Sequence, residues 1–414
     1  MIGRTNAVSK PGVELSLVVS VTSGAAVTAT KGSKTVNGTA AGGSCVLSLP
    51  EAGTWSVKAT LNGQTSDTKS VSVVDSYAVA LTFFSATITV NVDSGASVTL
   101  KKGGTTIATK TSNGTAVFTV TETGAYTVTA TKNGQTTSGS VNVVSGTTSY
   151  SLTLSFVSST LNNNEWSVIK SVSDAGQGAN YWSIGDRKAV TLNGTVGKLS
   201  LSNVTTYAFI IGFNHNASVE GANRIHFQLA KTALSGGTDV CFCDNQYGPD
   251  SGWSSPGAGY FVMNASNTNS GGWNNSYMRK TICPAFLAAL PTAWQNIIAA
   301  CTKYSDNTGG GSNTASYVTA TSDKIWLLSE MEVQGARSYA NSAEANYQKQ
   351  YDYYRNGNSK VKYQHTATTS ACYWWLRSVI ASYTYSFCIV GTDGSAGGDN
   401  AYYSYGFAAP SVYT

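Results

Sequence analysis

The chain has 414 residues, of which 41% are hydrophobic, 11% are aromatic and only 11% are charged. This hydrophobic content excludes an intrinsically disordered protein, and the length allows two to four domains with sizeable cores. The net charge is only +5 and the lysines and arginines are scattered, which argues against a nucleic-acid-binding protein. The many Gly, Ser, Thr, Asn and Tyr residues favour a β-rich extracellular or virion protein.

The N-terminal stretch MIGRTNAVSKPGVELSLVVSV contains no uninterrupted apolar segment, because Lys10, Pro11 and Glu14 divide it. We therefore expect neither a secretory signal peptide nor insertion into a membrane. The protein is expected to be made in the cytoplasm and to leave the cell, if it leaves at all, by another route such as lysis.

A repeat occupies the first part of the chain. EAGTWSVKATLNGQT at 51–65 matches ETGAYTVTATKNGQT at 122–136, with an offset of about 71 residues. Apolar and polar residues alternate within each copy, which is the pattern of half-buried strands. An Asn-Gly pair falls between two such runs in each copy, at 62–63 and 133–134, and predicts a tight hairpin turn.

The two copies predict two small immunoglobulin-like β-sandwiches, one over residues 1–85 and one over 86–157. They resemble modules that are common in phage tail and bacterial surface proteins, although the Cys–Trp–Cys framework of antibody domains is missing. No catalytic or metal-binding group recurs in them, so we expect them to be spacers.

The composition changes after the second copy, and residues 158–414 predict one mixed α+β domain with long loops. Two strands are expected between residues 205 and 230, and helices almost only beyond residue 280. In DKIWLLSEMEVQG (323–335), a helix is expected to open at Ser329 and to end at Gly335. Another helical segment, 284–304, places six apolar residues on one face: Phe286, Leu290, Trp294, Ile297, Ile298 and Cys301. Within it, Pro291 is expected to open a new helix.

Cysteine and acidic residues give no pattern of a metal site. An odd number of cysteines without a signal peptide predicts free, buried thiols and no structural disulfide; the seven are Cys45, Cys241, Cys243, Cys283, Cys301, Cys372 and Cys388. None has zinc-like spacing to a second pair or to a histidine. Asp239, Asp244 and Asp250 lack the regular spacing of a calcium loop, so we expect no metal and no cofactor.

Five segments of residues 158–414 resemble, in the same order, a domain of unknown function that is common in bacteriophages of gut bacteria. They are YWSIGDRKAVTLNGTV (181–196), FIIGFNHNASVEGANRIHFQLAKT (209–232), MNASNTNSGGWNNSYMR (263–279), DKIWLLSEMEVQG (323–335) and CYWWLRS (372–378). The resemblance implies a C-type lectin-like fold. The predicted fold class is thus mainly β and multidomain, with two immunoglobulin-like sandwiches followed by an α+β C-type lectin-like domain.

The resemblance also implies a role for the stretch SVIASYTYSFCIVGTDGSAGGDNAYYSYGF (378–407). In many phage members, this region is the variable region of a diversity-generating retroelement, which copies a template with errors at adenines. AAC and AAT codons diversified in this way cannot yield Lys, Glu, Gln, Met or Trp, and none of these occurs in the stretch. By this resemblance the varied, ligand-binding positions are Ile380, Ser382, Tyr383, Tyr385, Ser386, Ile389, Gly391, Gly397, Gly398, Asp399, Asn400, Tyr402 and Tyr403.

The physical chemistry of the stretch agrees with a binding surface. Tyrosine offers a large, rigid contact area at low entropic cost, while Ser, Gly and Asn offer adaptable hydrogen bonds. Between the varied positions, Phe387, Cys388, Val390 and Ala401 are expected to be fixed and to point inward. The alternative is a half-buried strand surface made by Tyr383, Tyr385, Tyr402, Tyr403 and Tyr405.

These inferences together predict a phage receptor-binding protein or tail-tip adhesin, located in the virion at the tail tip or fibre. Its expected partners are a host cell-surface protein or glycan and other phage tail proteins, and a homotrimer is one assembly to consider. The alternative is a structural virion or bacterial surface protein without diversification.

An enzyme acting on cell-wall glycan is a weaker alternative, and we expect no enzymatic activity. Such an enzyme needs a pair of facing carboxylates. Glu330 and Glu332 lie only two residues apart on the expected helix and therefore face different ways. Glu330 is expected to make a polar contact that is specific to the fold.

Overall fold

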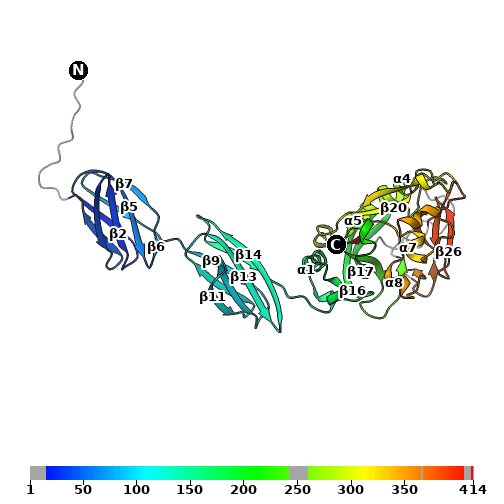
Figure 1. Cartoon of the computed structure of the whole chain (residues 1–414), viewed down its shortest axis with the longest axis horizontal. Coiled ribbons are helices and arrows are strands. Elements are labelled where there is room, and N and C mark those ends of the chain that lie inside the picture. The colour runs from blue at the N-terminus through cyan, green and yellow to red at the C-terminus, as the bar shows by residue number, and fades with distance from the viewer. Residues whose placement is uncertain (1–14, 242–259, 365–366, 405–411, 414) are drawn as a thin grey trace, which may run out of the picture. The chain divides into compact units, whose positions relative to one another are not determined.

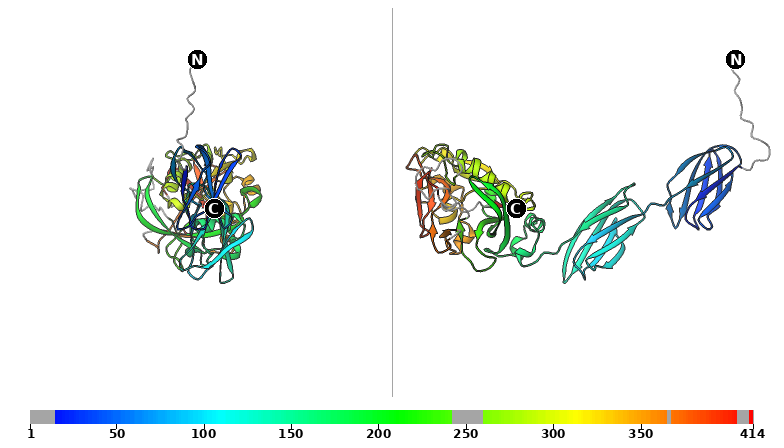
Figure 2. Two further views of the ribbon diagram at one scale, coloured as in Figure 1. Left: turned by 90° about the vertical axis from the view of Figure 1, so that its left-hand side faces the viewer. Right: turned by 180° about the vertical axis from the view of Figure 1, so that it is seen from behind.

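The computed structural model describes residues 15–241, 260–364, 367–404 and 412–413 of the chain. Its internal contacts divide it into two compact units, Met1–Phe156 and Val157–Thr414. The described part of the first unit contains strands and no helix, whereas the second mixes strands with short helices (Figure 1, Figure 2). The predicted mainly β character is therefore confirmed.

The first unit begins with a β-sandwich that has a core of its own. Its strands are β1 (Ser16–Ser20), β2 (Ala26–Lys31), β3 (Lys34–Thr39), β4 (Ser44–Ser48), β5 (Gly53–Leu61), β6 (Gln64–Thr65), β7 (Lys69–Val73) and β8 (Ser76–Ala80). One sheet has the order β4-β1-β8 and the other β3-β2-β5-β6, with β7 paired to β5. Alternate residues such as Leu17, Val19 and Trp55 are buried, so each strand turns one face to the core.

A second sandwich follows and repeats this plan around a separate core. Its strands are β9 (Ala86–Asn91), β10 (Ser97–Lys102), β11 (Thr105–Thr111), β12 (Thr115–Val120), β13 (Gly124–Lys132), β14 (Gln135–Val143) and β15 (Ser149–Thr153). The sheets have the orders β12-β9-β15 and β11-β10-β13-β14. Tyr126 takes the place of Trp55 in the repeat. The hydroxyl of Tyr126 donates to the backbone oxygen of Glu122 (2.8 Å), and the indole N–H of Trp55 donates to that of Glu51 (3.2 Å), in each case four residues earlier.

The two Asn-Gly pairs form the predicted hairpin turns. Asn62 and Asn133 both have φ of 50°, and the following glycines both have φ of 79°. Two successive residues with positive φ are the requirement of a type I′ turn, which matches the twist of the flanking strands. The strands β5–β6 and β13–β14 pair directly across these turns, so this prediction is confirmed.

The described part of the second unit contains four sheets and several short helices around one large core. Its strands are β16 (Arg187–Val196), β17 (Leu199–Phe213), β18 (Ile225–Lys231), β19 (Val240–Cys241), β20 (Cys301–Asp306), β21 (Val318–Asp323), β22 (Lys362–Gln364), β23 (Ala371–Cys372), β24 (Trp374–Val379), β25 (Ser386–Val390), β26 (Ala396–Asn400) and β27 (Val412–Tyr413). They form the sheets β16-β17-β18-β27, β19-β22-β23, β20-β21 and β24-β25-β26. β17 and β18 confirm the two strands that were predicted between residues 205 and 230.

Helices also occur well before residue 280, so the prediction that they are almost confined beyond it is wrong. The helices are η1 (Leu161–Asn163), α1 (Trp166–Asp174), α2 (Gly178–Tyr181), α3 (Ala217–Glu220), α4 (Gly272–Asn275), η2 (Met278–Ile282), α5 (Cys283–Ala289), α6 (Thr292–Gln295), η3 (Ala315–Tyr317), α7 (Glu330–Gln334), η4 (Ser342–Asn346) and α8 (Asp352–Arg355). Most have a single turn, which is too short to produce a hydrophobic period in the sequence. No described helix is long and apolar enough to cross a membrane.

The single helical face expected over 284–304 is also corrected, whereas the new helix expected at Pro291 is confirmed. α5 ends at Ala289, Leu290 is extended (ψ 157°), and α6 starts directly after Pro291. Proline disfavours the helical conformation of the residue before it, which divides the segment. Cys301 lies in the strand β20 and not on a helix.

The helix α7 matches its prediction closely. Ser329 is its N-cap and accepts a hydrogen bond from the backbone of Glu332, whose side chain in turn accepts from the backbone of Ser329. This reciprocal capping box satisfies two backbone donors at the helix start. Gly335 ends the helix with a φ of 74°, a left-handed conformation that glycine adopts without steric cost.

Candidate ligand-binding surface

The sequence-predicted binding residues lie on the C-terminal sheet β24-β25-β26 and in the segments next to its strands. This sheet lies at the end of the second unit opposite to α1 (Figure 1, Figure 2). We call residues 380–386, which connect β24 to β25, the display turn. Tyr383 and Tyr385 are 48% and 38% exposed, with ring centroids 5.5 Å apart, and Ser382 is exposed beside them. The structure therefore places these three predicted residues together at the surface.

Six further predicted residues are half-buried along β26 and directly after it: Gly397, Gly398, Asp399, Asn400, Tyr402 and Tyr403. The ring centroids of the last two lie 4.9 Å apart. β26 pairs with β25, and the backbone N–H of Ala401 donates to the carbonyl oxygen of Tyr385 (2.8 Å). This hydrogen bond brings the end of β26 next to the display turn.

The remaining four predicted residues do not lie on the surface. Ile380, Ser386 and Ile389 are each 4% exposed, and Gly391 is also buried. The expectation that these positions belong to an exposed binding surface is wrong for them. Ser386 and Ile389 lie on the central strand β25, whose residues are all buried. Ile380 directly follows β24 and Gly391 directly follows β25, and both are buried as well. Their assignment as varied positions stays a prediction.

The residues expected to point inward do so. Phe387, Cys388, Val390 and Ala401 are all fully buried. Tyr405, which the alternative interpretation included among the surface tyrosines, lies outside the described residues.

The other side of the display turn is held by Glu330. Its carboxylate accepts hydrogen bonds from the backbone N–H groups of Ser338 (2.8 Å), Tyr339 (3.0 Å) and Ala340 (2.7 Å). This segment pairs with the turn, because the N–H of Ala381 donates to the carbonyl oxygen of Tyr339 (2.9 Å). Glu330 thus makes a polar contact specific to the fold, which confirms its prediction.

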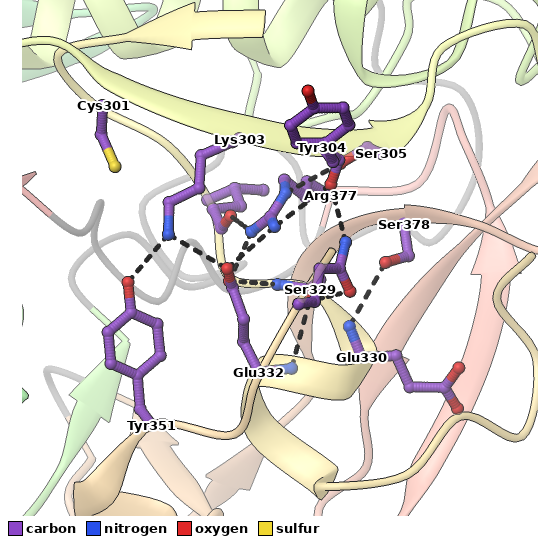
Figure 3. A network of polar contacts seen from close by, with 12 residues as sticks. Cys301, Lys303, Tyr304, Ser305, Ser329, Glu330, Glu332, Tyr351, Arg377 and Ser378 are labelled. Carbon is purple, nitrogen blue, oxygen red and sulfur yellow. Dashed lines mark hydrogen bonds and ion pairs between the residues drawn. The ribbon is translucent and has the colours of Figure 1, made fainter. Parts of the chain in front are cut away.

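A buried network of charged side chains lies behind this sheet (Figure 3). Arg377 of β24 is fully buried, and its two terminal nitrogens donate to the two carboxylate oxygens of Glu332. Its Nε donates to the hydroxyl of Ser305 (2.8 Å), and Nη1 also donates to the carbonyl oxygen of Leu327 (2.9 Å). A planar guanidinium matched by two carboxylate oxygens fixes β24 in one position.

Lys303 is the second cation of the network. Its Nζ contacts Glu220 Oε2 (2.7 Å) and Glu332 Oε1 (3.0 Å) and donates to the hydroxyl of Tyr351 (2.9 Å). Burial opposes ionisation of Glu332, but Arg377 and Lys303 hold its pKa well below its ordinary range. The charge of Glu332 is therefore balanced within the protein, whereas burial raises the pKa of Glu220.

His215, Glu220 and Glu332 have ligand atoms within 4.8 Å of one another, a spacing that could hold a metal ion. The ammonium of Lys303 contacts both carboxylates and occupies the position of such a cation. Burial, followed by the charge of Lys303, lowers the pKa of His215 from 6.5 to about 3, so its ring is neutral at pH 7. All members are at least nine-tenths buried, so the cluster is a structural element that a substrate cannot reach.

Glu344 connects the network to the start of the C-terminal strand region. It accepts a hydrogen bond from the hydroxyl of Ser378 (2.6 Å) and another from the backbone N–H of Asp306 (2.8 Å). No cation contacts its carboxylate among the described residues, and burial raises its pKa to about 7.

The remaining sequence candidates for metal or redox chemistry are also accounted for. Asp239 forms ion pairs with Lys231 and Lys362, while Asp244 and Asp250 lie outside the described residues. Five cysteines are free and buried: Cys45, Cys283, Cys301, Cys372 and Cys388. Cys241 is also buried, and Cys243 lies outside the described part of the chain.

Sequence reasoning missed the residues that hold the surface in place, such as Asn269, Lys303 and Arg377. The segment WWLRS contained one clue to Arg377, because an arginine within an apolar strand needs a buried partner for its charge. Nothing in the sequence identified that partner as Glu332.

A family model described as a domain of unknown function (DUF6273) matches residues 260–410, which include the display turn. No curated protein matches the chain. The minor pilin GBS52 of Streptococcus agalactiae is similar at 10% identity and a TM-score of 0.23, over 35% of this chain and 97% of that chain. The TIE protein of Bacillus anthracis is similar at 12% identity and a TM-score of 0.18, over 47% of this chain and 41% of that chain. The major pilin subunit BcpA of Bacillus cereus is similar at 18% identity and a TM-score of 0.15, over 27% of this chain and 41% of that chain. At these TM-scores the similarities carry no argument. The display turn thus belongs to a matched region whose description assigns no function.

Proposed function

We propose that this chain is a phage receptor-binding protein or tail-tip adhesin. In this proposal two immunoglobulin-like sandwiches carry a C-type lectin-like domain, whose C-terminal region is diversified by a retroelement. The supporting observation is the display turn, where exposed tyrosines follow one another on a backbone that is held by residues outside the turn. Such a surface can change its side chains without losing its shape.

The residue types of the turn support recognition of a host cell-surface protein or glycan. Tyr383 and Tyr385 expose aromatic area, and aromatic side chains dominate the binding energy of many interfaces. Ser382 and Thr384 add hydroxyl groups between them. The absence of charged side chains from Ser382–Tyr385 favours contacts through shape, stacking and hydrogen bonds over electrostatic steering.

Binding of the full chain to intact bacterial cells tests this proposal. A fluorescently labelled protein is incubated with a panel of gut bacterial strains, and retention on cells is compared for wild type, Tyr383→Ser and Tyr385→Ser. Tyr181→Ser is the matched control, because Tyr181 is similarly exposed (37%) but lies in α2, outside the surface. We expect loss of retention for the first two variants only. Equal retention of all four proteins would contradict the proposal.

The burial of Ile380, Ser386, Ile389 and Gly391 favours a second candidate, a structural virion or surface protein without diversification. Four buried positions in a list of varied ones limit how freely that list can change. Sequencing of the DNA beside the gene separates the two functions. A nearly identical, adenine-rich template repeat beside a reverse-transcriptase gene supports diversification, and the absence of both supports the structural protein.

A further inference from the structure

The side chain of Asn269, from the segment MNASNTNSGGW, lies fully buried beneath the display turn. Its Nδ2 donates hydrogen bonds to the carbonyl oxygens of Tyr383 (2.6 Å) and Ser386 (3.2 Å). Its backbone N–H donates to the carbonyl oxygen of Thr384 (2.9 Å). One residue therefore binds three backbone oxygens of a turn that is more than a hundred positions away in the sequence.

The acceptor groups of Asn269 are used as well. Its Oδ1 accepts from the backbone N–H of Gly310 (3.0 Å), and its carbonyl oxygen accepts from the N–H of Gly272 (2.9 Å). The segment Gly309–Gly311 packs closely between Asn269 and the turn. A Cβ on Gly309 would lie 2.0 Å from the carbonyl oxygen of Asn269, and a Cβ on Gly311 would lie 3.2 Å from Thr384 Cγ2.

The side chains of Ser382–Tyr385 contribute little to the conformation of the display turn. Among the described residues, no hydrogen bond joins the side chains of Ser382–Tyr385 to the rest of the protein. The turn is fixed through backbone atoms, by Asn269 on one side and by the Glu330-bound segment on the other. A backbone held in this way keeps its path when its side chains are exchanged.

We propose that Asn269 is a positioning residue, which fixes the backbone of the display turn so that positions 382–385 can vary independently of folding. The inference rests on the proposed function, since only a recognition surface needs a turn of fixed shape with exchangeable side chains. It assigns a role to the MNASNTNSGGW segment, which does not itself contribute an exposed tyrosine.

Hydrogen–deuterium exchange of the full chain tests the proposal without any ligand. The variant is Asn269→Asp, which keeps the size and the acceptor but places a carboxylate against two carbonyl oxygens. Asn164→Asp is the matched control, because Asn164 is also buried (3% exposed) and its Nδ2 donates to the carbonyl oxygens of Ser158 and Thr160, both at 3.0 Å. The reporters are the amides of Ala381, Tyr383 and Ala401, which donate hydrogen bonds within or beside the turn.

We expect Asn269→Asp to lower the protection of the three reporter amides by about tenfold or more, since a buried hydrogen-bonding group loses its partners. Amides of β17 and β18 should keep their protection. Asn164→Asp should lower protection near Ser158–Asn164 only. Protonation of the new carboxyl at acidic pH restores a hydrogen-bond donor at position 269. The protection of the reporter amides, compared with wild type at the same pH, should therefore recover in acid. General destabilisation of the protein would not produce such a recovery.

Unchanged reporter amides in Asn269→Asp, or a loss without recovery in acid, would overturn the proposal. If that variant loses protection throughout the second unit, Gly311→Ala decides instead. The new methyl group presses on Thr384 at a glycine with φ of 74°, and it should expose the same three amides; unchanged amides would again overturn the proposal. Because no ligand is used here, the two tests are separate: retention of Tyr383→Ser on cells equal to that of the wild type contradicts the proposed function alone.

Discussion

The Cδ1 atom of Ile380 lies 1.8 Å from the position that a Cβ on Gly398 would occupy. Ile380 directly follows β24 and Gly398 lies in β26, so they belong to the two outer strands of the C-terminal sheet. The side chain of Ile380 fills the space that Gly398 leaves by having no side chain. Both are among the positions that sequence reasoning assigned to variation, so they cannot vary independently of each other.

This pair gives a first prediction. Gly398→Ala should destabilise the protein by about 1–3 kcal/mol, the usual cost of forcing an extra methyl group into a packed core. The double variant Ile380→Ala/Gly398→Ala should recover part of that loss, because the smaller side chain leaves room for the new methyl. Urea denaturation of the wild type, both single variants and the double variant measures the coupling; additive effects would contradict it.

A second prediction separates the exposed tyrosines from the buried apolar residues. Phe387→Ala and Trp375→Ala should each reduce the free energy of unfolding by about 3–5 kcal/mol, since both side chains are fully buried. Tyr383→Ser and Tyr385→Ser should change it by less than about 1 kcal/mol. Melting curves of the four variants decide; tyrosine variants that melt as early as Phe387→Ala would show that these rings belong to the core.

The third prediction concerns the buried ion pair of Arg377 with Glu332. Arg377→Met removes the cation and leaves the carboxylate with Lys303 alone, which should cost about 3–5 kcal/mol. Arg377→Lys keeps the charge but loses the paired hydrogen bonds, and it should therefore rescue only part of that stability. Full rescue by lysine in chemical denaturation would mean that charge alone matters at this position.

A fourth prediction follows from the environment of Glu344, whose pKa rises from its ordinary value of 4.5 to about 7 in the folded protein. Between these pH values the folded protein retains a proton that the unfolded chain has released. The free energy of unfolding should therefore fall as pH rises through this window, by roughly 3 kcal/mol in total. Below pH 4.5 this contribution is fully present, and above pH 7 it is lost.

Glu344→Gln cannot release a proton, so this variant should lack that part of the pH dependence. The comparison must be made as a difference, because the neutral, buried His215 contributes with the opposite sign in an overlapping window, between its lowered pKa of about 3 and 6.5. His215 is present in both proteins and cancels. Parallel curves of stability against pH for the two proteins would contradict the assignment.

The fifth prediction concerns the thiols. Thiol counting in denaturant without reductant should report all seven cysteines as free, since Cys45, Cys283, Cys301, Cys372 and Cys388 are buried free thiols. Recovery of five or fewer would mean at least one disulfide.

Features that depend on neighbouring residues could be predicted from the sequence. The Asn62-Gly63 turn and the capping box of Ser329 are local, so the backbone preferences of a few residues decide them. Alternation in the repeats gave the sandwich strands for the same reason.

What depended on distant contacts could not be predicted. Asn269 contacts the display turn 114 residues away. Cys301 lies in the strand β20, which pairs with β21, although the sequence around it predicted a helix. The family resemblance marked Ile380 and Ile389 as surface positions, yet the tertiary structure buries both: Ile380 in the display turn and Ile389 on the central strand β25.

The separation between Ser382–Tyr385 and the buried residues around them has a practical consequence for engineering. A combinatorial library confined to these four consecutive positions would sample new specificities while leaving the hydrophobic interior and its charged network untouched. Ile380, Ser386 and Ile389 are each 4% exposed, so randomising them would destabilise many members of the same library. The most productive set of randomised codons is therefore narrower than the set that the family resemblance implies.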